Sequence, residues 1–213
     1  MLKLCREVSS TGMPKHFGPL GDASVRIYRH RALWAGATFA IAMNRQLWDI
    51  SPPIAPDSPL FPGDTGYSQL WTAQIGPGCP VNLSAITMSP HIGAHADAPL
   101  HYGPGAQTIG EVDLAPYLGP CRVIHVIGCG PLVRPEHLAH AIDRLPPRVL
   151  VRTCTTAPTR WSAEFAAFAP ETIAWLASLG VRLVGIDSQS VDPADSKTLV
   201  SHLLLLTHDL RVL

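Results

Sequence analysis

The stretch Ser89–His101, SPHIGAHADAPLH, places three histidines and one aspartate within thirteen residues. Imidazole nitrogens and carboxylate oxygens together are the ligands of hydrolytic zinc sites, and they also suit manganese or iron. Each histidine alone would fit a polar loop equally well. Four such side chains within eleven positions, in the spacing H-x3-H-x-D-x3-H, predict a metal site. The four residues are His91, His95, Asp97 and His101.

Small residues separate the candidate ligands, so one loop can bring several side chains to one centre without crowding. They are Gly93, Ala94, Ala96 and Ala98. Pro99 then interrupts regular structure and restricts the approach of His101. A metal-activated water needs ligands that lower its pKa and a base that accepts its proton. The stretch offers enough groups for both tasks.

The composition indicates a compact protein and excludes some classes of partner. The chain has 213 residues, of which 46% are hydrophobic and 15% are charged, as expected for one domain or one domain with an extension. Basic and acidic residues number 16 each, so the net charge of zero argues against nucleic acid as a partner. No apolar run reaches the length needed to span a bilayer, so no membrane partner is expected. Five scattered cysteines without a C-x-x-C pair predict reduced thiols in a cytoplasmic protein.

Residues 1–42 differ from the rest of the chain. They carry six basic and two acidic residues, and an apolar segment begins at Ala32. Ala40-Ile41-Ala42 resembles a signal-peptide cleavage site, but about thirty residues precede the apolar segment, which is unusual for a signal peptide. We therefore predict a poorly ordered extension at 1–42 and a folded domain at 43–213.

Hydrophobic patterning predicts alternating strands and helices, and hence an α/β fold. Short strands are expected at 47–51, 81–88, 121–127, 148–151 and 181–186, and the strand at 81–88 should have one buried face and lead directly into the histidine stretch. Helices are expected at 135–145 and at 162–179, the latter broken by Pro170 and ended by Gly180. The segment after Pro193 reads as helical up to Leu213.

Three further residues are candidates for the site. Phe61 lies on a proline-rich loop, where an aromatic ring could cover a substrate or the edge of the core. Asp187 follows a strand, and a capping or turn role is favoured for it over a catalytic one. His202 precedes an apolar run that would turn it inward. A serine hydrolase is disfavoured because no G-x-S-x-G is present and Ser188 has no evident partner.

The histidine stretch resembles the H-x-G-T-H-x-D-x-P-x-H motif of the cyclase-like metal-dependent hydrolases. The resemblance extends over about residues 44–213. It includes the segments Leu47–Ser51, Phe61–Thr65 and Gly185–Pro193, and also His202.

This resemblance implies a swivelling β/β/α domain, a homodimer and two zinc ions per subunit, with manganese as an alternative. His91, His95 and Asp97 would bind the first metal, and Asp97 would bridge to a second metal that His202 also holds. His101 would donate and accept protons, and Phe61 would contact the substrate. Within the family the chain is most similar to members that hydrolyse N-formyl-L-kynurenine to L-kynurenine and formate in tryptophan breakdown. The alternatives are hydrolysis of another amide or lactam, or an inactive metal-binding relative.

Three departures from the family pattern bear on these expectations. Ala94 replaces a threonine, and Phe61 replaces a tryptophan, which removes an N–H donor. The family also has a glutamate ligand about twelve residues after the histidine that matches His202, a position just past Leu213. The resemblance therefore implies that the family's C-terminal strands are missing from this chain and that the second metal is weak or absent.

Overall fold

The computed structural model describes residues 27–28 and 47–213, which fall into one unit up to Ile50 and a second unit, Ser51–Leu213. In the first unit, strand β1 (Ile27–Tyr28) pairs antiparallel with β2 (Leu47–Trp48). The strand expected at 47–51 is therefore present but shorter. Apart from residues 27–28, the predicted extension at 1–42 lies outside the described residues.

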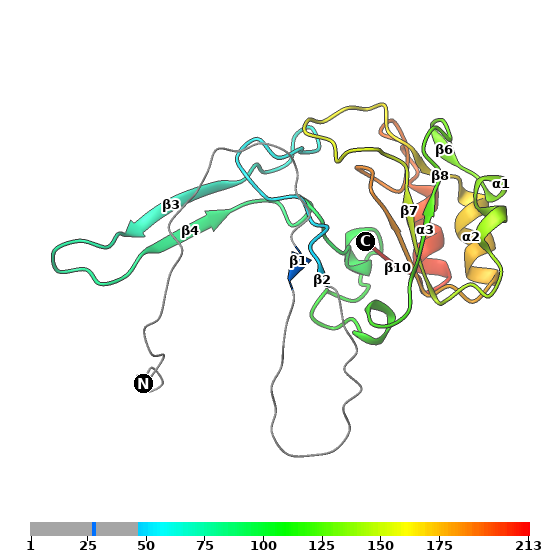
Figure 1. The fold of residues 1–213 in the computed structure, drawn as a ribbon, viewed down its shortest axis with the longest axis horizontal. Coiled ribbons are helices and arrows are strands. Elements are labelled where there is room, and N and C mark those ends of the chain that lie inside the picture. The colour runs from blue at the N-terminus through cyan, green and yellow to red at the C-terminus, as the bar shows by residue number, and fades with distance from the viewer. Residues whose placement is uncertain (1–26, 29–46) are drawn as a thin grey trace, which may run out of the picture. The chain divides into compact units, whose positions relative to one another are not determined.

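A four-stranded parallel sheet organises the second unit, and Figure 1 shows it beside the helices. The strand order is β10-β9-β7-β5. The strands predicted at 121–127, 148–151 and 181–186 are confirmed, and so is the α/β class. Three residues of β9 are buried in succession, as expected for a strand covered on both faces. The strands are β5 (Arg122–His125), β7 (Arg148–Arg152), β9 (Leu183–Ile186) and β10 (Arg211–Val212).

The helices pack apolar side chains against this sheet, and α2 contacts α3. Ile173 and Leu176 of α2 and Leu205 of α3 are fully buried. Gly180 ends α2 as predicted, because its φ of +84° reverses the chain and its N–H donates to the Ala177 carbonyl. The helix expected at 135–145 is shorter. The helices are α1 (Pro135–Leu138), α2 (Pro170–Ser178), α3 (Val200–Thr207), and the 3-10 turns η1 (Pro99–His101), η2 (Ala115–Tyr117) and η3 (Ala139–Ala141).

Two helix predictions are wrong. Residues 162–169 are not helical, and β8 (Ala167–Phe168) instead pairs in parallel with β6 (Leu132–Val133). The reason is Pro170, which disfavours helical backbone in the residue before it. The helix expected up to Leu213 ends at Thr207, and β10 follows it. A positive φ of 52° at Asp209 turns the chain, after which its main chain pairs with β9.

The prediction of a buried face for the strand at 81–88 is also wrong. Strand β4 (Leu83–Thr87) is exposed along its whole length. Among the described strands it pairs only with β3 (Ser68–Ala73), in an antiparallel hairpin that projects away from the parallel sheet (Figure 1). A lone two-stranded hairpin has no second layer to cover its apolar side chains.

No helix in the described part of the chain is long and apolar enough to cross a membrane.

Candidate metal centre

The loop that follows β4 is hydrogen-bonded to the residue directly after the turn at 61–64. The Ser89 N–H donates to the Thr65 carbonyl at 2.8 Å, and the Ser89 hydroxyl accepts the His91 N–H at 3.2 Å. Ile92 is buried with 2% of its surface exposed, so it anchors the loop to the unit. The histidine side chains therefore project from a segment held at both its start and its middle.

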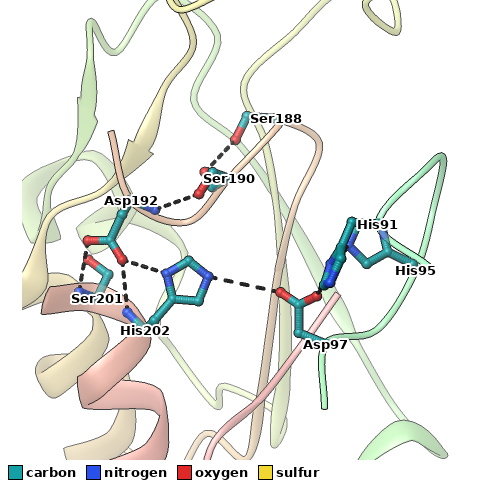
Figure 2. A network of polar contacts seen from close by, with 8 residues as sticks. All are labelled: His91, His95, Asp97, Ser188, Ser190, Asp192, Ser201 and His202. Carbon is teal, nitrogen blue, oxygen red and sulfur yellow. Dashed lines mark hydrogen bonds and ion pairs between the residues drawn. The ribbon is translucent and has the colours of Figure 1, made fainter. Parts of the chain in front are cut away.

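Asp97 lies at the centre of the histidines (Figure 2). Its Oδ1 atom is 2.8 Å from His91 Nδ1 and 3.3 Å from His95 Nε2. Its Oδ2 atom faces the opposite way, 4.0 Å from Nε2 of His202. The two carboxylate oxygens thus serve two separate groups of imidazoles.

The donor atoms fit a bound cation. The Nδ1–H of His95 donates to the Gly93 carbonyl at 2.8 Å, which leaves the Nε2 lone pair directed at the cluster. Asp97 Oδ1 is buried and accepts no hydrogen bond from the described residues, although two imidazole nitrogens lie within 3.3 Å. His91 Nδ1 and His95 Nε2 are themselves 3.3 Å apart, within hydrogen-bonding distance. Imidazole nitrogens and a carboxylate that converge in this way are stabilised by a positive charge between them.

The pKa shifts of His95 and Asp97 support the same conclusion. The Asp97 carboxylate beside it raises the pKa of His95, which outweighs the opposing effect of burial. Burial tends to raise the pKa of Asp97, but the neighbouring histidines, His95 first, lower it overall. Both shifts favour a negative carboxylate and a positive charge among the imidazoles.

His202 reaches the centre from the first turn of α3, and Asp192 holds it there. Asp192 Oδ2 accepts Nδ1–H of His202 at 2.6 Å, so the Nε2 lone pair of His202 points toward Asp97 (Figure 2). The same carboxylate accepts the backbone N–H groups of Ser201 and His202 at 2.9 and 3.0 Å. Only 2% of the surface of Asp192 is exposed. The arrangement is that of a carboxylate that orients a metal-ligating histidine.

Asp192→Asn should weaken metal binding about 10- to 100-fold, because an amide cannot fix the His202 tautomer as a carboxylate does. Titration of the metal-loaded protein with a competing chelator measures the change. Ser190→Ala is the control, since it removes only the hydroxyl that accepts the Asp192 N–H at 3.2 Å. Equal affinity in Asp192→Asn and wild type would contradict the positioning role.

His101 lies at the open side of the cluster on η1. Its ring centroid is 4.1 Å from that of His91 and 5.9 Å from that of His202. One nitrogen of His101 also lies within 4.8 Å of ligand atoms of His91 and Asp97. Partial desolvation lowers the pKa of His101, and the neighbouring histidines add to this effect against the opposing influence of Asp97. A neutral imidazole at neutral pH can accept a proton.

Phe61 lies on the turn that anchors the histidine loop. Its side chain is 49% exposed and contacts Trp161. Asp64, at the end of this turn, is close enough to Ser89 for the serine hydroxyl to lower the pKa of the carboxyl group. The turn therefore places an exposed aromatic ring on a segment that is bonded to the metal loop.

Gly93 has a conformation that other residues rarely adopt. Its φ is +71°, and a Cβ atom added there would lie 3.0 Å from Cγ1 of Ile54. Gly93→Ala should cost about 1–2 kcal/mol of stability from backbone strain alone. It should also lower activity, because the Gly93 carbonyl orients His95. Thermal unfolding and turnover check both effects, with Gly78→Ala, also at positive φ but in open space, as the control. Equal loss of activity in the two variants would contradict the local role.

The structure brings together the four residues of the histidine stretch and His202, and places Phe61 on the adjacent turn. Asp187 has a structural contact, because it accepts hydrogen bonds from the backbone and hydroxyl of Thr153 at 2.7 Å each. Sequence reasoning missed Asp192. Its signal was weak: an acid before Pro193, ten residues ahead of His202.

Comparison with known proteins supports one family. The model of a family described as "Putative cyclase" matches residues 48–193. The kynurenine formamidase of Bordetella avium is 64% identical over 170 residues, which cover 79% of this chain and 81% of that protein. The kynurenine formamidase of Delftia acidovorans is 64% identical over 171 residues, or 80% and 82% of the two chains.

A solved structure described as a potential metal-dependent hydrolase with cyclase activity has the same fold. It superposes with a TM-score of 0.64 at 24% identity, over 76% of this chain and 77% of the other. The mixed parallel and antiparallel sheets described above agree with this relationship. The chain belongs to the cyclase family.

Proposed function

We propose that this protein hydrolyses N-formyl-L-kynurenine to L-kynurenine and formate in tryptophan breakdown. The observation that carries the proposal is the convergence of the histidines on Asp97, in a chain 64% identical to kynurenine formamidases. The identity of these relatives does not favour the alternative of another amide or lactam, nor that of an inactive relative. The reaction is hydrolysis of an aryl formamide, which needs an activated water and a protonated leaving nitrogen.

Two groups of ligands surround Asp97. We assign His91, His95 and Asp97 Oδ1 to one metal ion, because the nitrogens lie within 3.3 Å of that oxygen. Asp97 Oδ2 and His202 face a second position. Imidazole and carboxylate ligands suit zinc, and manganese is the alternative. Such an ion supplies Lewis acidity, which lowers the pKa of a water molecule and stabilises a developing oxyanion.

We assign proton transfer to His101. It lies next to the ligands on the open side of the cluster, and its lowered pKa keeps the imidazole neutral at neutral pH. His101 would accept the proton of the attacking water and then donate it to the aniline nitrogen as the C–N bond breaks. Phe61 would cover the aromatic ring of the substrate, since its exposed ring lies on the turn bonded to the metal loop.

The reaction is tested by following the formation of L-kynurenine optically with the full chain, with zinc supplied and after chelation. We expect turnover that chelation abolishes and that added zinc restores. Metal analysis of the active protein gives the identity and number of the ions. A folded, zinc-loaded protein without turnover of N-formyl-L-kynurenine would contradict the proposal.

We further propose that the protein is a homodimer and that the β3–β4 hairpin contributes to the contact. Large apolar side chains on the hairpin are exposed in the single chain, which is typical of a surface covered by a partner. Trp71 and Ile86 lie on one face of it, 49% and 57% exposed. Trp71→Ser combined with Ile86→Lys should shift the mass measured by light scattering from twice 22.9 kDa toward 22.9 kDa. A monomeric wild type would contradict the proposal.

We also propose that the protein is cytoplasmic and that residues 43–213 form its folded domain. The four cysteines in the described part of the chain are free, which is consistent with a reducing compartment. The family match starts at residue 48, close to the proposed start of the domain.

A further inference from the structure

Phe61 and Trp161 form an aromatic pair at the surface. Their ring centroids are 4.7 Å apart and their planes meet at 66°, an edge-to-face contact. Phe165 extends the row, with its centroid 5.9 Å from that of Trp161. Phe61 is about half exposed, Trp161 is half-buried, and neither belongs to the buried core. Apolar rings that gather outside the core are typical of ligand-binding surfaces.

Gln189 holds the backbone on both sides of Trp161. Its Nε2 donates to the Arg160 carbonyl at 3.1 Å, and its Oε1 accepts the Ser162 N–H at 3.4 Å. Gln189 belongs to the same short segment as Asp192, which orients His202. Through Gln189, Trp161 is therefore connected to the segment whose Asp192 holds His202.

Phe61 is connected to the histidine loop by a hydrogen bond four residues further along the chain, which the Ser89 N–H donates to the Thr65 carbonyl. The two rings come from segments one hundred residues apart. The segment of Phe61 is hydrogen-bonded to Ser89, at the start of the histidine loop, and the segment of Trp161 is hydrogen-bonded to Gln189, three residues before Asp192. The indole N–H of Trp161 makes no hydrogen bond to the residues that the structure describes, so this donor is available to a ligand.

We propose that Trp161 forms the second wall of the site for the substrate's aromatic ring and donates its indole N–H to a substrate oxygen, with Gln189 as its positioning residue. The proposal rests on the proposed function, because it takes the aryl formamide as the substrate. Because the planes of Trp161 and Phe61 meet at 66°, an aryl ring can stack on one of them and contact the other edge-on. The acyl oxygen on such a ring is an acceptor for the indole N–H. Trp161 thus supplies the donor that Phe61 lacks.

Binding of L-kynurenine to the zinc-loaded protein, measured by calorimetry, tests the ring site without requiring turnover. Trp161→Leu removes ring and donor and should weaken binding about tenfold, whereas Trp161→Phe keeps a ring and should weaken it about threefold. In turnover, both variants should raise KM more than they lower kcat. Trp175→Phe is the matched control, since Trp175 packs against the core, and it should leave binding unchanged.

Gln189→Met provides a second test that leaves Trp161 in place. It removes both backbone contacts at similar side-chain length and should raise KM about threefold with little change in kcat. Circular dichroism identifies folded variants, and Gln189→Met and Trp161→Phe decide the result if Trp161→Leu does not fold.

Unchanged binding in all three variants would overturn the proposal, as would a wild type that does not bind L-kynurenine. Binding that depends on Trp161 in a protein without turnover would support the ring site and reject the proposed reaction. The two hypotheses can therefore fail separately.

Discussion

His101→Ala is expected to lower kcat about 10²- to 10⁴-fold while the metal content stays at the wild-type level. The reason is that His101 is assigned the proton transfer rather than metal binding, and general acid–base catalysis contributes a factor of about this size. Steady-state turnover of N-formyl-L-kynurenine gives the rate. Metal analysis after dialysis against metal-free buffer gives the zinc content.

The two measurements together separate two roles for His101. Its nitrogen lies within 4.8 Å of ligand atoms of His91 and Asp97, so the geometry also allows it to bind a metal. A parallel loss of zinc and activity would identify His101 as a ligand and reject the proton-transfer role. His140→Ala, on the exposed surface of η3, controls for the general loss of an imidazole. It should change neither quantity.

Asp97→Asn is expected to remove bound metal and to lower turnover about a thousandfold or more. Both carboxylate oxygens face imidazoles, so replacing this one residue removes the negative charge from both of the proposed metal positions. A bound metal contributes several kcal/mol of transition-state stabilisation, and each 1.36 kcal/mol corresponds to about a tenfold change in rate. The activity that remains should match that of the chelated wild type.

Asp113→Asn is the matched control for Asp97→Asn, because Asp113 is an exposed loop residue whose carboxylate accepts a local backbone N–H. It should keep wild-type metal content and rate. If Asp97→Asn retained stoichiometric zinc in both positions, Asp97 could not be the bridging ligand.

Several parts of the fold could be predicted because the signal is local. Apolar runs such as those at 148–151 and 181–186 reflect burial on both faces of a parallel sheet, and burial of this kind is visible in composition. Gly180 marks the end of α2 because few residues other than glycine adopt its backbone conformation readily. The exposure of β4 could not be predicted, since alternation of apolar and polar residues does not reveal whether a covering layer exists.

Strand β10 could not be predicted either, because the local sequence does not show which strand will lie beside it. Its residues have a helical pattern, and the main-chain hydrogen bonds with β9 make them a strand. One of these bonds runs from the Leu213 N–H to the Val184 carbonyl, across residues far apart in the chain. Local preference is weaker than such pairing when a neighbouring strand is available.

The candidate metal loop, the α/β class and the family could all be predicted from the amino-acid sequence, because closely spaced ligands and strand-length apolar runs are properties of the chain. Close spacing limits how far apart His91, His95 and Asp97 can lie, whatever the rest of the fold does. Which distant residues support this loop became visible from the folded structure alone. Asp192 beside His202, and Trp161 beside Phe61, meet through the packing of separate segments, and no local pattern encodes such contacts.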